Sequence, residues 1–113
     1  MVDEFVSLAN PERNDVDLYL TCLAEEIEEF IEAVTLYELE QTATTRENLV
    51  KEMADVQYTL SQLALGYRVD LQSCFELVHK SNMSKLENGS VLRRSDGKIL
   101  KGKHYQAPNL KGF

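Results

Sequence analysis

LTCLAEEIEEFIEAV, residues 20–34, and KEMAD, residues 51–55, are the two stretches from which the fold can be inferred. The first carries five glutamates within eight residues, and its apolar side chains recur at spacings of three and four: Leu20, Leu23, Ile27, Phe30, Ile31 and Val34. Such spacing is typical of an amphipathic helix that packs one face against a neighbour. The second stretch lies in a similar pattern, formed by Leu49, Met53, Val56, Leu60 and Leu63. The two stretches predict two consecutive helices.

Signals on the amino-terminal side predict a short helix before the long one. Residues 2–9 have an amphipathic pattern, and the proline after Asn10 ends it, because the residue before a proline is disfavoured in the helical region. Asn14 or Asp15 can then cap the long helix, which is expected to end near Gln41.

Two further helices are predicted on the carboxyl-terminal side. Thr44 or Thr45 is a plausible cap for a third helix over residues 46–65, and Gly66 suits the left-handed position at its end. Asp70 can cap a fourth helix, whose helical pattern fades after Asn82.

The last part of the chain has a different pattern. Residues 91–100 are expected to form a small hairpin around an Asp-Gly turn, and the segment after it is expected to be a loose or partner-dependent tail. Helices joined by short connections become antiparallel neighbours. The predicted fold is therefore all-α: an antiparallel helical bundle of about four helices, with a short C-terminal hairpin or irregular tail.

Length and charge limit the functional classes. A chain of 113 residues fits one domain, residues 1–113, of which residues 85–113 form a basic, partly irregular tail. The net charge of −7 argues against a nucleic-acid polymer or an anionic membrane as the main partner. Residues 1–79 hold 17 acids and 4 bases, whereas residues 80–113 hold 8 bases and 2 acids. With neither a signal-peptide pattern nor an apolar run of membrane-spanning length, we expect a cytoplasmic protein.

The acidic residues of the two central helices are spaced so that they can converge. Glu26 and Glu29 are neighbours on one helix, and Glu52 and Asp55 are neighbours on the next. Two like charges about 4 Å apart repel by about 4 kcal/mol at an effective dielectric constant of 20. Oxygen ligands suit Mg²⁺ or Mn²⁺, and the first helix has no Lys or Arg of its own to neutralise it. A solvated acidic surface is the alternative, and the residues alone leave both open.

Glu25-Glu26-x-x-Glu29, followed after 22 residues by Glu52-x-x-Asp55, resembles the signature of the MazG-like all-α nucleoside triphosphate pyrophosphohydrolases. That superfamily also includes the phosphoribosyl-ATP pyrophosphohydrolases and the dimeric dUTPases. Residues 78–86, VHKSNMSKL, with Asp96-Gly97-Lys98 and Lys101-Gly102 further on, are similar to the short phage- and cassette-type members. The resemblance covers the chain from about residue 5 to residue 110.

The resemblance implies a function and a role for each matching residue. Such proteins hydrolyse a nucleoside triphosphate between the α and β phosphates. The residues that match Mg²⁺ ligands of the family are Glu26, Glu29, Glu52 and Asp55. Glu25 matches an adjacent glutamate that holds further metal or the attacking water. The positions that fall where relatives contact substrate are Lys80, Asn82 and Lys85, with Lys98 and Lys101 as weaker candidates.

Partners and rival functions complete these expectations. The resemblance implies a homodimer or homotetramer, because the sites of the family are built across packed helical units. The rivals to a house-cleaning nucleotide hydrolase are a phosphoribosyl-ATP pyrophosphohydrolase and a non-catalytic helical interaction module.

Overall fold

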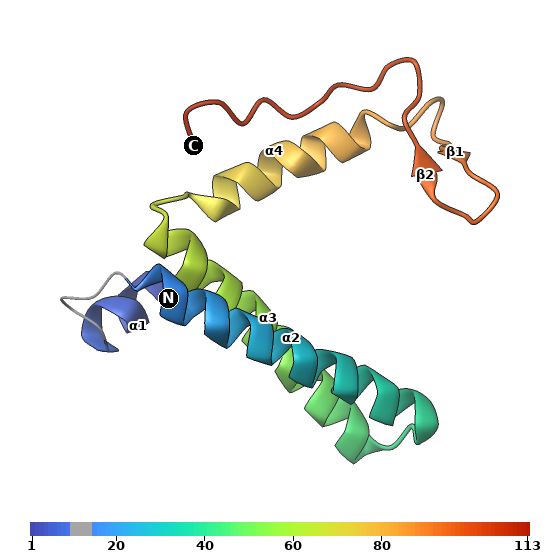
Figure 1. Ribbon diagram of the computed structural model, residues 1–113. Coiled ribbons are helices and arrows are strands. Elements are labelled where there is room, and N and C mark those ends of the chain that lie inside the picture. The colour runs from blue at the N-terminus through green and yellow to red at the C-terminus, as the bar shows by residue number, and fades with distance from the viewer. Residues whose placement is uncertain (10–14) are drawn as a thin grey trace. The chain divides into compact units, whose positions relative to one another are not determined.

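The computed structural model describes residues 1–9 and 15–113 (Figure 1). Its elements are α1 (Val2–Ala9), α2 (Val16–Leu39), α3 (Ala43–Gly66), α4 (Leu71–Met83), β1 (Leu92–Arg93) and β2 (Ile99–Leu100). The predicted all-α fold, with four helices in this part of the chain and a small terminal hairpin, is confirmed. The chain divides into two compact units, Met1–Val69 and Asp70–Phe113. The predictions made for Asn10 and Asn14 lie outside the described residues.

The first unit is built on an antiparallel pair of long helices. In Figure 1, α2 and α3 lie side by side along their length, joined by a short turn. Ala33 on α2 and Leu49 on α3 are buried, as expected for residues that face the partner helix. The short helix α1 packs on α3, where the rings of Phe5 and Tyr58 meet edge to face with their centroids 5.7 Å apart.

Helix α2 begins as one of the two sequence alternatives predicts. The Asp15 side chain accepts a hydrogen bond from the backbone N–H of Leu18 at 3.0 Å, so Asp15 is the N-cap.

None of the described helices has the length and apolarity needed to cross a membrane.

Helix α3 begins earlier than predicted, and the prediction of Thr44 or Thr45 as its cap is wrong. The N-cap is Thr42, whose side-chain oxygen accepts a hydrogen bond from the Thr45 N–H at 3.1 Å. Thr45 returns the contact by accepting from the Thr42 N–H at 3.0 Å, and its hydroxyl donates to the Glu40 carbonyl at 2.6 Å. This reciprocal pair satisfies two backbone donors at once, so the helix begins at Ala43.

The end of α3 also differs from the prediction. Gly66 is buried inside the last turn, and the residue in the left-handed conformation is Arg68, with a φ angle of 59°. The N–H of Arg68 donates to the Leu65 carbonyl at 3.0 Å, and that of Val69 donates to the Ala64 carbonyl at 2.9 Å. These bonds occupy carbonyls that the helix end leaves open, so they favour the turn even though the residue is not glycine.

The second unit contains α4 and the hairpin. Asp70 caps α4 as predicted, since its carboxylate accepts a hydrogen bond from the Ser73 N–H at 3.1 Å. The hairpin pairs β1 with β2 around the predicted Asp-Gly turn. There Gly97 has a φ angle of 94°, and the Arg94 N–H donates to the Lys98 carbonyl at 2.7 Å.

The irregular tail is anchored within its own unit. The Ser81 hydroxyl donates to the Gln106 carbonyl at 2.7 Å, and the Gln106 N–H donates to Ser84 Oγ at 2.8 Å. Glu87 Oε1 accepts from the Lys103 N–H at 2.7 Å. The tail that the sequence pattern describes as loose is therefore tied to α4 and the residues just after it.

Most of the apolar stripe on the long helices stays exposed. Tyr19, Ala33 and Leu49 are the described apolar side chains that are classed as buried. The large apolar side chains that remain more than a third exposed on these two helices include Leu20, Ile27, Ile31 and Val34 of α2, and Val50, Met53 and Leu60 of α3. This unit leaves a large apolar surface uncovered.

Candidate metal centre

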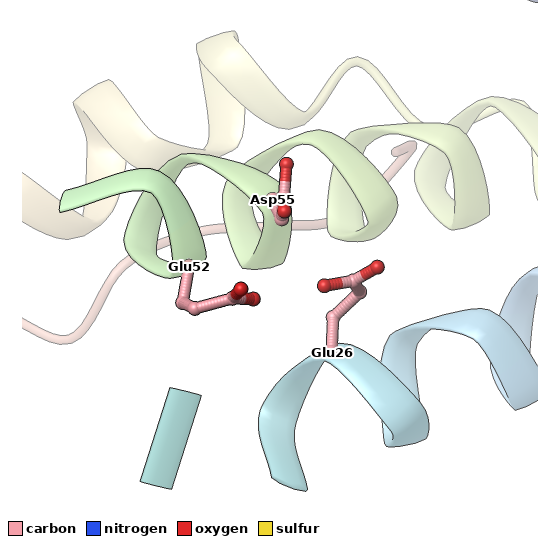
Figure 2. A group of neighbouring side chains, drawn as sticks. All are labelled: Glu26, Glu52 and Asp55. Carbon is pink, nitrogen blue, oxygen red and sulfur yellow. The ribbon is translucent and has the colours of Figure 1, made fainter. Parts of the chain in front are cut away.

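Three carboxylates from the two long helices converge. Glu26 projects from α2, while Glu52 and Asp55 project from α3, one turn apart (Figure 2). One oxygen of each carboxylate lies within 4.8 Å of the corresponding oxygens of the other two. The 3.6-residue repeat puts residues three apart on one helix face, and the antiparallel pairing brings the α2 residue opposite them.

Two of these carboxylates are buried enough to need a partner. Glu52 is only 7% exposed, and Glu26 is half-buried. Within the described part of the chain, Oε2 of Glu26 and Oε2 of Glu52 are buried without a hydrogen-bond partner. Burying a charged oxygen without compensation is costly. The cluster offers three carboxylates as hard oxygen donors, and two of them have a buried oxygen without a partner. This arrangement fits a divalent cation that prefers oxygen ligands.

Electrostatics at Glu26 agree with that geometry. Partial burial raises the pKa of the Glu26 carboxyl group above its ordinary value, and the negative charges of Glu29 and Asp55 raise that pKa further. The folded chain therefore disfavours a full set of ionised carboxylates at this place. A bound cation would reverse this preference, because it stabilises the charged form of each ligand.

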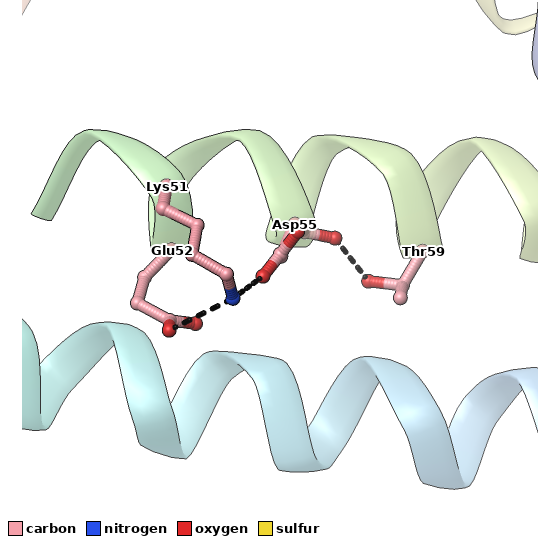
Figure 3. A network of polar contacts seen from close by, with 4 residues as sticks. All are labelled: Lys51, Glu52, Asp55 and Thr59. Atoms are coloured by element: carbon pink, nitrogen blue, oxygen red, sulfur yellow. Dashed lines mark hydrogen bonds and ion pairs between the residues drawn. The ribbon is translucent and has the colours of Figure 1, made fainter. Parts of the chain in front are cut away.

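Lys51 supplies a positive charge to the same cluster. Its Nζ atom lies 2.7 Å from Asp55 Oδ2 and 3.5 Å from Glu52 Oε1, as Figure 3 shows. The hydrogen bond to Asp55, followed by the charges of Asp55 and Glu52, raises the pKa of the Lys51 ammonium group. The glutamate motif gives this lysine no role. Its spacing does carry a signal, because a base four residues before an acid on one helix predicts an ion pair.

The remaining acidic candidates lie near this group without joining it. Glu29 is exposed on α2 and is not among the three converging carboxylates, although its charge acts on Glu26. Glu25 is also exposed on α2. Thr59, one turn after Asp55, is buried, and its hydroxyl donates to the Asp55 carbonyl at 2.9 Å (Figure 3). The roles predicted for Glu25 and Glu29 stay predictions.

The predicted substrate contacts all lie in the second unit. Lys80 and Asn82 are exposed on α4, and Lys85 follows its end. Lys98 precedes β2 and Lys101 follows it. Lys80 lines a pocket between α4 and the tail, together with Leu77, Ser81, Gln106, Ala107, Pro108 and Asn109. The Lys101 ammonium lies 4.9 Å from the centre of the Tyr105 ring, close enough for a cation–π contact. Their contacts with a substrate stay predictions.

Comparison with known proteins assigns the family. A family model described as phosphoribosyl-ATP pyrophosphohydrolase matches residues 4–82, which include most of α1, all of α2 and α3, and therefore the whole carboxylate cluster. No curated protein matches the chain. The match spans more than half of the sequence and agrees with the glutamate signature and the all-α fold. The chain therefore belongs to the phosphoribosyl-ATP pyrophosphohydrolase family, within the MazG-like pyrophosphohydrolase superfamily.

Proposed function

We propose that the protein is a Mg²⁺-dependent nucleoside triphosphate pyrophosphohydrolase. In this reaction water hydrolyses the anhydride linkage between the α and β phosphates, which yields a nucleoside monophosphate and pyrophosphate. The supporting observation is the convergence of Glu26, Glu52 and Asp55 in a chain that belongs to a pyrophosphohydrolase family. A house-cleaning role, acting on canonical or modified deoxynucleotides, is part of the proposal.

The carboxylates of the two long helices would hold the metal. Glu26, Glu52 and Asp55 provide the converging oxygens, and Glu29 stands next to them on α2 as a fourth ligand in this proposal. Mn²⁺ would be accepted by the same oxygen ligands. When bound, the metal ion neutralises phosphate oxygens and lowers the pKa of a coordinated water molecule.

The other residues would position water and substrate. Glu25, exposed on α2, would orient the attacking water and accept its proton. The groups proposed to bind the phosphates and the sugar are Lys80, Asn82, Lys85, Lys98 and Lys101. A lysine acts on phosphate as a compact positive charge, so it stabilises the negative charge that builds up on the departing pyrophosphate.

Phosphoribosyl-ATP is the second candidate substrate, and the description of the matching family favours it. The same cleavage would release pyrophosphate from it. The test is a panel of canonical and modified nucleoside triphosphates together with phosphoribosyl-ATP, each incubated with Mg²⁺ or with chelator. The products are separated as nucleotide, pyrophosphate and orthophosphate.

We expect pyrophosphate and a monophosphate from at least one compound, only with the metal. Release of orthophosphate in place of pyrophosphate would contradict cleavage between the α and β phosphates. If no compound on the panel is cleaved, the non-catalytic interaction module becomes the better interpretation.

The proposal includes a homodimer or homotetramer. The exposed apolar surface of α2 and α3 supports it, because monomeric proteins rarely leave so many large apolar side chains uncovered along one helix pair. A second copy would bury this surface.

A further inference from the structure

We infer that the ammonium group of Lys51 is a built-in counter-ion of the carboxylate cluster, which a divalent cation must displace, and that Lys51 thereby limits the metal affinity of the site. The inference rests on the metal site of the proposed function. It concerns a residue to which neither the family match nor the sequence motif assigns a role.

The contact geometry carries the inference. Lys51 Nζ contacts Asp55 Oδ2 at 2.7 Å and Glu52 Oε1 at 3.5 Å, so one ammonium group bridges two carboxylates of the cluster (Figure 3). Both ion pairs recorded for these two carboxylates in the described chain come from Lys51. The partner helix, α2, contains no basic residue that could substitute for it.

A metal ion and the ammonium group would compete for the same carboxylates. Mg²⁺ binds oxygen ligands at about 2.0–2.1 Å, and two of the three carboxylates that would hold it, Glu52 and Asp55, are the ones that Lys51 contacts. A single and a double positive charge held side by side would repel each other. The lysine can yield at small cost, because its side chain is 66% exposed and its four-carbon stem is flexible.

Burial determines which cation the cluster prefers. Lys51 reaches the exposed edge of the cluster, while Oε2 of Glu26 and Oε2 of Glu52 remain buried without a partner. The ammonium group therefore satisfies the cluster only in part. A divalent ion placed between α2 and α3 would address those inner oxygens, so Lys51 holds the carboxylates together without the metal and gives way when the metal binds.

The test is calorimetric titration of Mg²⁺ and of Mn²⁺ into the metal-free chain of residues 1–113 at constant pH and salt. Exposed ion pairs are weak, so Lys51→Met and Lys51→Gln should bind metal roughly 1.4- to fivefold more tightly than the wild type. Lys51→Arg keeps the positive charge and places it on a planar fork of donors, and should bind metal no more tightly than the wild type. Arg46→Met is the matched control, since it removes one positive charge from the first turns of α3 without touching the cluster.

Thermal melting supplies an independent readout. Without metal, Lys51→Met should melt at a lower temperature than Arg46→Met, because its carboxylates lose their counter-ion. When metal is added, the melting temperature of Lys51→Met should rise by more than that of Arg46→Met. Unchanged or weaker metal binding by both Lys51→Met and Lys51→Gln would overturn the inference while leaving the proposed function intact. A wild-type protein that binds no divalent cation would overturn both.

Discussion

Single residues of the cluster differ in how strongly the fold constrains them. Glu52 is the most constrained, because it is 7% exposed and faces α2 from the middle of α3. Asp55 is half-buried and takes the shorter contact from Lys51. Glu26 is the carboxyl group whose pKa the folded chain raises. Without a metal ion, the ionised carboxylate of Glu26 should therefore destabilise the folded chain more than the other two carboxylates do.

Replacing Glu26 by glutamine should stabilise the metal-free protein at neutral pH. The pKa of Glu26 is raised above 4.5 in the folded state. The folded state therefore binds this proton more tightly than the unfolded state does. The resulting gain in the free energy of unfolding is present below about pH 4.5 and is lost as the pH rises through the raised pKa. With chelator, Glu26→Gln should melt at a higher temperature than the wild type at about pH 7, and the difference should vanish near pH 4.

Glu32→Gln provides the control for that comparison, since it removes one negative charge from an exposed position of the same helix. Differential scanning calorimetry in chelator at both pH values decides the matter. Equal melting temperatures for Glu26→Gln and Glu32→Gln at neutral pH would mean that the cluster is not under electrostatic strain.

At the scale of elements, the α2–α3 hairpin holds the site together. Its register places Glu26 opposite Glu52 and Asp55, and the short turn before α3 sets where that helix begins. The cap at Thr42 determines the start of the helix on which two of the three carboxylates stand.

Loss of that cap should lower stability. Thr42→Ala removes the side-chain oxygen that accepts from the Thr45 N–H, and the loss of an N-cap threonine costs about 0.5–2 kcal/mol. Thr44→Ala is the control, because Thr44 is exposed and lies within the first turn, where alanine is a good helix former. Urea denaturation followed by circular dichroism should give a lower midpoint for Thr42→Ala than for Thr44→Ala. The reverse order would contradict the assigned cap.

The elements that local sequence signals determine were predicted well. Asp70 caps α4 and the Asp-Gly turn forms the hairpin, because each depends on contacts within three or four residues. The ends of α3 were not predicted, since several threonines compete for one cap and Arg68 takes a conformation usually left to glycine. The residue at which a helix begins or ends depends on the sum of several small contacts around that end. The propensity of a single residue does not predict that sum.

The candidate site shows the same division. The spacing of Glu52 and Asp55 predicts their proximity, because it depends only on the repeat of one helix. The approach of Glu26 required the antiparallel pairing of α2 and α3, which short connections imply. The contact of Lys51 with both acids depends on a side-chain conformation, and this lies beyond what helical spacing can determine.

At the scale of the whole molecule, self-association should depend on the exposed apolar stripe. Ile31 on α2 is 59% exposed, so Ile31→Glu should not disturb the folding of a single chain. Burying that charge in an apolar interface would cost more than about 1.4 kcal/mol, which corresponds to at least about tenfold weaker association. Thr44→Glu adds the same charge at an exposed position of α3 and serves as the control.

Sedimentation velocity over a range of concentrations measures this effect. The wild type and Thr44→Glu should sediment as a dimer or tetramer, and Ile31→Glu should shift toward the monomer. A wild-type chain that remains monomeric at the highest concentration would contradict the proposed oligomer.

The metal-dependent reaction is tested most directly by the rate of pyrophosphate release as a function of Mg²⁺ concentration, for the wild type and Asp55→Asn with the best substrate of the panel. We predict no release by the wild type in chelator and a saturating rise with Mg²⁺. Asp55→Asn should keep its helical circular dichroism spectrum but lose more than about 100-fold in rate, beyond the 10–100-fold typical of residues that only support a metal ligand. A chelator-resistant wild type, or an Asp55→Asn variant with the wild-type rate, would contradict a carboxylate-held metal as the centre of the chemistry.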